Sequence, residues 1–99
     1  MFIMISKQQY RSEIRIISDI LGVIRDAGKE GIIVSAISRS TNTSYKAINE
    51  KCKKLIDARL VESTKNNRNR SFVITEKGMS FFEQLQQFVE MIQTLNIRY

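Results

Sequence analysis

Residues 31–58 have the sequence GIIVSAISRSTNTSYKAINEKCKKLIDA, and this stretch indicates the fold more strongly than any other part of the chain. Its centre, TNTS at positions 41–44, consists of residues that favour turns and helix caps. A short segment with helical spacing precedes it at 35–40, and a longer one follows at 45–58. The stretch therefore predicts two helices joined by a tight turn.

The longer segment, 45–58, is amphipathic, and Ser44 or Thr43 can cap its first turn. At about 100° per residue, its apolar and polar side chains fall on opposite arcs of a helix. The apolar arc holds Tyr45, Ile48, Cys52, Leu55 and Ile56. The polar arc holds Thr43, Lys46, Glu50, Lys53, Lys54 and Asp57, with Asn49 at its edge. We expect the apolar arc to face the core and the polar arc to face outward.

A second helical pattern lies upstream, between residues 12 and 27. Its apolar stripe consists of Ile14, Ile17, Ile20, Leu21 and Ile24. Ser12 can cap this helix and Gly28 can end it. Residues 31–34 then form a short, buried strand, whereas residues 1–11 show no clear period.

Two strand candidates, 60–64 and 71–75, lie downstream on either side of the polar turn 65–70, which predicts a hairpin. Thr75 can cap a final helix that extends to about residue 96. Gly78 in its first turn has a poor helix propensity, so we expect another backbone to pack closely there.

The order of these elements is helix, short strand, short helix, turn, longer helix, hairpin and long helix. It corresponds to a winged helix-turn-helix, an α+β fold that is mainly α, with a two-stranded wing. With neither a proline nor a Gly/Ser linker, residues 1–99 form one domain. Within it we expect a core with the wing at 12–75 and a C-terminal dimerisation helix at 76–97.

Three fragments carry a resemblance to a known family. They are GIIVSAISRST (31–41), NTSYK (42–46) followed by Ile48, Leu55, Leu60 and Val61, and ITEKG (74–78). The chain resembles the winged helix-turn-helix family, and most of all small archaeal proteins that dimerise through a C-terminal coiled-coil helix. Those proteins include chromatin-associated and virus- or plasmid-encoded DNA binders, so the resemblance implies double-stranded DNA as the partner. It covers about residues 12–95 and departs at Lys51, where an aromatic residue is usual, and at Arg59, where a helix-ending glycine is usual.

Positive charge is concentrated in one segment of the chain. Nine basic and three acidic residues lie between positions 39 and 70, which leaves +6, the net charge of the whole protein. The rest of the chain carries seven residues of each sign. A basic surplus of this kind points to a polyanion such as nucleic acid. A solvated polar face is the alternative for a single helix, but the turn 65–70 adds three basic residues and no acidic one.

The second helix of a helix-turn-helix enters the major groove, where base edges carry the sequence information. Asn49 is suited to adenine, Lys46 to guanine and Glu50 to cytosine. Lys53, Lys54 and Arg39 are suited to phosphates, and Arg68 and Arg70 to phosphates or a minor groove. The candidate DNA contacts are Arg39, Thr43, Ser44, Lys46, Asn49, Glu50, Lys53, Lys54, Lys65, Arg68 and Arg70.

Two residues of the longer helix have alternative roles. The hydroxyl of Tyr45 can reach a phosphate, but its position on the apolar arc favours the edge of the core. Cys52 lies between lysines, which can activate a thiol as a redox switch. Its place beside Ile48 and Leu55 favours a small buried residue instead.

The final helix carries a coiled-coil seam with spacings of 4, 3, 4 and 3 residues. The candidate dimer interface consists of Phe81, Leu85, Phe88, Ile92 and Leu95, flanked by Phe82 and Val89. Left in water, this stripe would form a large apolar patch. We expect it to pair with a second copy, and its folding back on the first helix is the alternative.

The composition argues against several other classes of protein. Histidine is absent and Cys52 is the one cysteine, which excludes His-based acid–base catalysis, His/Cys zinc sites and an intrachain disulfide. The sequence shows no catalytic pair, phosphate loop or metal-ligand cluster, so we expect neither an enzyme nor a cofactor. The apolar segment 1–5 is too short for a signal peptide and no run could span a membrane, so we expect a cytoplasmic protein with no membrane partner.

These observations predict a homodimeric, sequence-specific transcription regulator. A chromatin-organising protein that binds DNA without sequence preference is the alternative within the same class. A winged-helix adaptor that binds another protein is the alternative from a different class.

Overall fold

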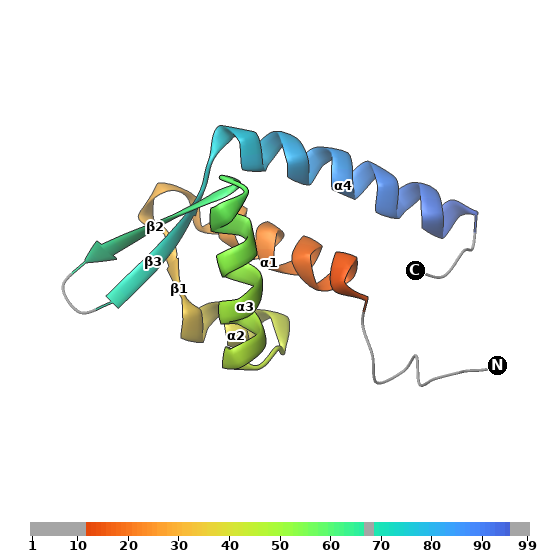
Figure 1. Ribbon diagram of the computed structural model, residues 1–99. Coiled ribbons are helices and arrows are strands. Elements are labelled where there is room, and N and C mark those ends of the chain that lie inside the picture. The colour runs from red at the N-terminus through yellow and green to blue at the C-terminus, as the bar shows by residue number, and fades with distance from the viewer. Residues whose placement is uncertain (1–11, 67–68, 96–99) are drawn as a thin grey trace.

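The computed structural model describes residues 12–66 and 69–95 and is shown in Figure 1. Along these residues the elements follow the predicted order. They are α1 (Glu13–Ala27), the 3-10 turn η1 (Gly28–Glu30), β1 (Ile32–Ile33), α2 (Val34–Thr41), α3 (Tyr45–Asp57), β2 (Val61–Asn66), β3 (Asn69–Ile74) and α4 (Glu76–Thr94). The winged helix-turn-helix fold is therefore confirmed, with a long C-terminal helix.

Helix α1 begins and ends where its caps predict. The Ser12 hydroxyl accepts a hydrogen bond from the backbone N–H of Arg15 at 3.2 Å, and Gly28 ends the helix with a φ of 68°. The stripe is buried from Ile20 onward, but Ile14 is 40% exposed, contrary to prediction. Helical spacing predicts only the direction in which a side chain points from the helix axis. Ile14 is exposed because the first turn of α1 extends past the buried cluster.

The turn between α2 and α3 is stabilised by its own polar side chains. Asn42 ends α2 in the left-handed conformation with a φ of 52°, and Ser44 caps α3 by accepting from the N–H of Ala47 at 3.1 Å. Thr43, the other cap candidate, instead donates its hydroxyl to the Thr41 carbonyl at 3.0 Å. The predicted strand 31–34 is shorter than expected, because Val34 already belongs to α2.

A three-stranded antiparallel sheet has the order β1-β3-β2, so the wing hairpin carries one additional short strand. Residues 65–70 were expected to form a polar turn, and the structure corrects this prediction. Strands β2 and β3 continue into it, with Lys65 opposite Arg70 and Asn66 opposite Asn69. Polar residues at an exposed edge extend a ladder as readily as apolar ones, because the ladder is made by backbone groups.

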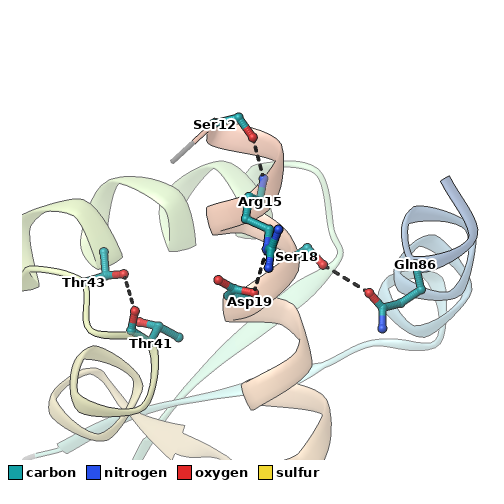
Figure 2. A network of polar contacts seen from close by, with 7 residues as sticks. All are labelled: Ser12, Arg15, Ser18, Asp19, Thr41, Thr43 and Gln86. Carbon is teal, nitrogen blue, oxygen red and sulfur yellow. Dashed lines mark hydrogen bonds and ion pairs between the residues drawn. The ribbon is translucent and has the colours of Figure 1, made fainter. Parts of the chain in front are cut away.

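Helix α4 lies alongside α1, as Figure 1 shows. Phe82 is 4% exposed and belongs to the core cluster, and its ring lies against Gly22 of α1. Farther along, the Ser18 hydroxyl donates to the Gln86 side-chain oxygen at 3.4 Å, a contact visible in Figure 2. One side of α4 thus folds back on α1, which was the alternative considered for its apolar stripe.

The start of α4 confirms the expected close approach at Gly78. Thr75 caps the helix by accepting from the Gly78 N–H at 2.9 Å, while the Thr75 N–H donates to the Leu60 carbonyl at 3.1 Å. A Cβ at position 78 would lie only 2.0 Å from that carbonyl oxygen. Arg59, which replaces the usual helix-ending glycine, takes the left-handed conformation itself, with a φ of 65°.

Candidate nucleic-acid interface

Helix α3 separates its two arcs as its periodicity predicts. Ile48, Cys52 and Leu55 are at most 2% exposed and belong to the core cluster. The opposite side is exposed and carries Lys46, Asn49, Glu50 and Lys53, which we call the α3 outer face. Because the core takes up Ile48, Cys52 and Leu55, the groups that this helix offers to a partner are mainly polar.

A groove of about 420 Å³ joins the α3 outer face to the wing. Asn49 and Lys53 of α3 line it from one side and Arg70 of β3 from the other, over a floor that includes Ile56 and Phe72. The sequence separates Lys53 from Arg70 by a strand and a turn, and the hairpin brings them to one surface. Two cations and an amide at a groove are chemically suited to a phosphate and an adjacent base edge.

The N-terminal end of α3 differs from expectation at two positions. Thr43 is half-buried in the turn and bonded to Thr41, so it does not stand on the α3 outer face. Tyr45, expected at the edge of the core, is 55% exposed, because the first residue of α3 precedes the buried part of the helix. This exposure favours the alternative interpretation, in which Tyr45 contacts a phosphate.

Lys54 has a partner within the chain, which helical spacing did not predict. Its Nζ lies 2.5 Å from the Glu13 Oε2, and the Lys51 Nζ lies 3.4 Å from the same oxygen. Hydrogen bonds and charge from Lys54 and then Lys51 hold the pKa of the Glu13 carboxyl below its usual range. The pairing joins residues 41 positions apart, so only the packing of α1 beside α3 reveals it.

The remaining basic candidates lie on α2 and the wing. Arg39, Lys65 and Arg70 are all exposed. Arg68 lies outside the described residues. Lys65 and Arg70 are register partners on adjacent strands, so their side chains stand on the same face of the hairpin.

Cys52 is 1% exposed, as its position on the apolar arc predicts. Burial raises the pKa of its thiol to about 11. A buried, protonated thiol is a poor nucleophile, so Cys52 serves as a small core residue.

The apolar stripe of α4 divides between core and surface. Phe82 and Val89 are 4% and 7% exposed, so both are already buried in the single chain and leave little surface for a second copy to cover. Leu85 and Ile92 are half-buried. The exposed large apolar side chains at α4 are Met79, Phe81, Phe88, Met91 and Leu95, which are 45%, 40%, 45%, 60% and 62% exposed. Met91 was not predicted, because it lies outside the heptad spacing of the seam.

None of the helices in the part of the chain that the structure describes combines the length and the hydropathy of a membrane-spanning segment. Among the same residues, no group of three or more Cys, Asp or Glu side chains lies close enough to hold a metal ion.

Several solved structures share this fold. Sso10a-2, a DNA-binding protein from Sulfolobus solfataricus, is 19% identical with a TM-score of 0.75, and the match covers 86% of this chain and 85% of that one. MepR, a transcription regulator of the Staphylococcus aureus multidrug efflux pump MepA, is 19% identical with a TM-score of 0.69 over 90% of this chain and 66% of MepR. BpsR from Bordetella bronchiseptica, whose DNA binding is regulated by 6-hydroxynicotinic acid, is 16% identical with a TM-score of 0.72 over 89% and 62%.

These identities establish a common fold and nothing finer. None of the curated proteins matches the sequence. The family comparison is more specific, because a winged helix-turn-helix family matches residues 10–93, which include every element from α1 to nearly the end of α4. The chain therefore belongs to the winged helix-turn-helix family.

Proposed function

We propose that this protein is a homodimeric DNA-binding protein that regulates transcription from specific sites. Helix α3 enters the major groove, and the wing contacts the backbone or an adjacent minor groove. The observation that carries the proposal is the groove in which Asn49, Lys53 and Arg70 meet. It combines a group able to read a base with two cations on one exposed surface.

The α3 outer face supplies the groups for reading sequence. Asn49 has the donor and acceptor that adenine requires, Lys46 donates to guanine, and Glu50 accepts from cytosine. The acidic side chain at position 50 lowers affinity for phosphates, so its presence on this face favours a role in base recognition. This favours a sequence-specific regulator over a chromatin-organising protein.

Contacts to the DNA backbone come from the side chains around the α3 outer face. Lys53 and Arg70 line the groove, and Arg39 and Lys65 are exposed on neighbouring elements. Ser44 and Thr43 lie at the start of α3, where its backbone N–H groups favour a phosphate. Tyr45, which is 55% exposed, is a further candidate, and Arg68 remains one on the basis of the sequence.

The exposed apolar surface of α4 favours a homodimer. Phe81, Phe88 and Leu95 repeat every seven residues, so they lie in one line along the helix. A two-fold pairing of these surfaces would cover the apolar groups and present two α3 helices. Successive major grooves on one side of DNA are about 34 Å apart, so such a dimer is suited to an inverted repeat.

Two other proteins of the fold support the DNA-binding class. Sso10a-2 is described as DNA-binding and MepR as a transcription regulator. The adaptor remains the alternative from another class, and it predicts no binding to DNA at physiological salt. An enzymatic role has no support from the described side chains.

The deciding experiment selects bound sequences from a random DNA pool and then compares the selected duplex with a random one. We expect the selected duplex to bind at least 1,000-fold more tightly, on the order seen for specific regulators. Equal affinities would favour the chromatin protein, and no binding to either duplex would favour the adaptor.

A matched pair of variants tests the groove. Arg70→Gln is expected to weaken binding and to lower the slope of log K against log salt by about 0.9, because one phosphate contact is lost. Arg25→Gln removes the same charge from α1, where the guanidinium lies over the Phe82 ring, and is expected to leave the slope unchanged. Equal effects of the two variants would contradict the assignment of Arg70.

A further inference from the structure

The four lysines of α3 serve two different surfaces. Lys46 and Lys53 belong to the α3 outer face, and Lys53 shares its groove with Arg70. Lys51 and Lys54 instead reach the carboxylate of Glu13, in the first turn of α1. Net charge along the sequence therefore overstates the charge that α3 offers to DNA.

The arrangement around Glu13 is compact. Both ammonium groups lie within 4 Å of the same carboxylate oxygen, at 3.4 Å for Lys51 and 2.5 Å for Lys54. The Lys51 side chain is 17% exposed, whereas those of Lys54 and Glu13 are 62% and 48% exposed. Lys51 is thus confined beside α1, and Lys54 would be free to move if its partner were removed.

Two consequences follow for a helix that reads DNA. Contacts from Lys51 and Lys54, one turn apart, to one point on α1 resist rotation of α3 about its own axis. Rotation by one residue position, about 100°, would take Asn49 and Glu50 away from a base. The carboxylate also offsets positive charge that would otherwise attract phosphates regardless of sequence.

We propose that Glu13 is a positioning residue for α3, which holds Lys51 and Lys54 against α1 and keeps the ammonium group of Lys54 off the DNA backbone. This inference rests on the proposed DNA-binding function. It replaces the sequence-based assignment of Lys54 as a phosphate contact, while it leaves that of Lys53 in place.

A cycle of variants in the full chain tests the proposal through the salt dependence of binding to a random duplex. Glu13→Gln frees Lys54 and is expected to steepen the slope of log K against log salt by about 0.9. Over a roughly fourfold decrease in salt concentration, the affinity of this variant then rises about 3-fold more than that of the parent. Lys54→Met is expected to leave the slope unchanged. In the Lys54→Met background, Glu13→Gln is expected to have no effect on the slope, because the lysine that it frees is gone.

Two controls accompany the cycle. Lys53→Met, at the adjacent position, is expected to lower the slope by about 0.9, as the loss of a true phosphate contact does. Glu83→Gln removes one acidic charge from the exposed surface of α4 and is expected to leave the slope unchanged. If Glu83→Gln steepened the slope as much as Glu13→Gln, the effect would come from total charge and the proposal would be overturned.

The pairing itself is measured without DNA, by NMR titration of the Glu13 carboxyl. Its midpoint is expected to rise when Lys54 is replaced by Met, because the largest cause of its lowered pKa is lost. An unchanged midpoint, or a Lys54→Met variant that lowers the slope as Lys53→Met does, overturns the positioning role. A parent chain that binds no duplex contradicts the proposed function instead, and the titration still determines whether Glu13 and Lys54 pair.

Discussion

Helices α3 and α4 are both amphipathic, but their apolar sides have different fates. Helix α3 buries Ile48, Cys52 and Leu55 completely and leaves a polar outer face. Helix α4 buries Phe82 and Val89 against its own chain and leaves Phe81, Phe88 and Leu95 substantially exposed. The difference arises because the core covers the middle of the apolar side of α3, whereas it contacts only one part of the apolar surface of α4.

The contrast assigns different kinds of partner to the two helices. A surface of lysines, an amide and a carboxylate gains little from an apolar partner but can donate to and accept from DNA. A line of aromatic and aliphatic side chains gains from being removed from water, at about 25 cal/mol per Å². Each of the following variants changes one side of this contrast, in order of decreasing effect.

The largest effect is expected where α4 is attached to the rest of the chain. Gly78→Ala places a Cβ 2.0 Å from the Leu60 carbonyl oxygen, which forces the helix away from the residue that precedes β2. The better helix propensity of alanine gains about 1 kcal/mol, but the overlap is expected to cost more, for a net loss of about 3 kcal/mol. Urea unfolding measures the loss.

Gly22→Ala is the control, because its Cβ would meet the Phe82 ring at 3.4 Å, close to ordinary contact. We expect that variant to lose less than about 1 kcal/mol. A Gly78→Ala variant as stable as the parent would contradict the close attachment of α4.

The exposed side of α4 is tested by Phe88→Ser. Because the change occurs twice in a two-fold dimer, we expect dimer dissociation to become about 100-fold easier. The stability of the single chain is expected to change little, since Phe88 is 45% exposed. Analytical ultracentrifugation over a concentration series measures the dissociation constant.

Glu90→Ser, at an exposed position on another side of α4, is the control and is expected to leave the dissociation constant unchanged. A parent protein that remains monomeric at high concentration would show that α4 does not pair with a second copy.

The smallest effect concerns the buried side of α3. Burial raises the pKa of Cys52 from 9.0 to about 11, so the unfolded chain ionises its thiol before the folded chain does. The stability contributed by the neutral thiol is therefore full below about pH 9 and is lost as the pH rises to about 11. We expect a loss of about 2 kcal/mol over this interval.

Comparison with Cys52→Ala isolates this effect, because the two proteins differ only in that side chain. The difference in unfolding free energy between parent and variant is expected to stay constant up to pH 9 and then to decrease. A constant difference up to pH 11 would indicate that the thiol is more accessible to water than its 1% exposure implies.

Local chemistry was sufficient to predict most of the fold. Caps at Ser12, Ser44 and Thr75 depend on groups within three residues, so the helix starts were correctly placed. The helical period of α3 also predicted the burial of Cys52, because this side chain points in the same direction from the helix axis as those of Ile48 and Leu55. The close approach at Gly78 followed from a residue that helices disfavour.

Errors occurred where a residue's environment depends on how far a neighbouring element extends. Ile14 and Tyr45 have the right direction for the core but lie in first turns that the core does not cover. The wing strands continue to Asn66 and resume at Asn69, because backbone pairing does not depend on the polarity of the side chains. The seam of α4 was treated as one surface, although Phe82 and Val89 are already buried within the single chain.

The amino-acid sequence determines the order of elements, their caps and the placement of the +6 charge between residues 39 and 70, since each depends on residue identity or on contacts within a few positions. Tertiary packing determines which of those charges are available. It brings Lys53 beside Arg70, 17 positions away in the sequence, and holds Lys54 at Glu13, 41 positions away. Helical periodicity describes directions around one axis, whereas the partner of a charged side chain depends on which second element lies in that direction.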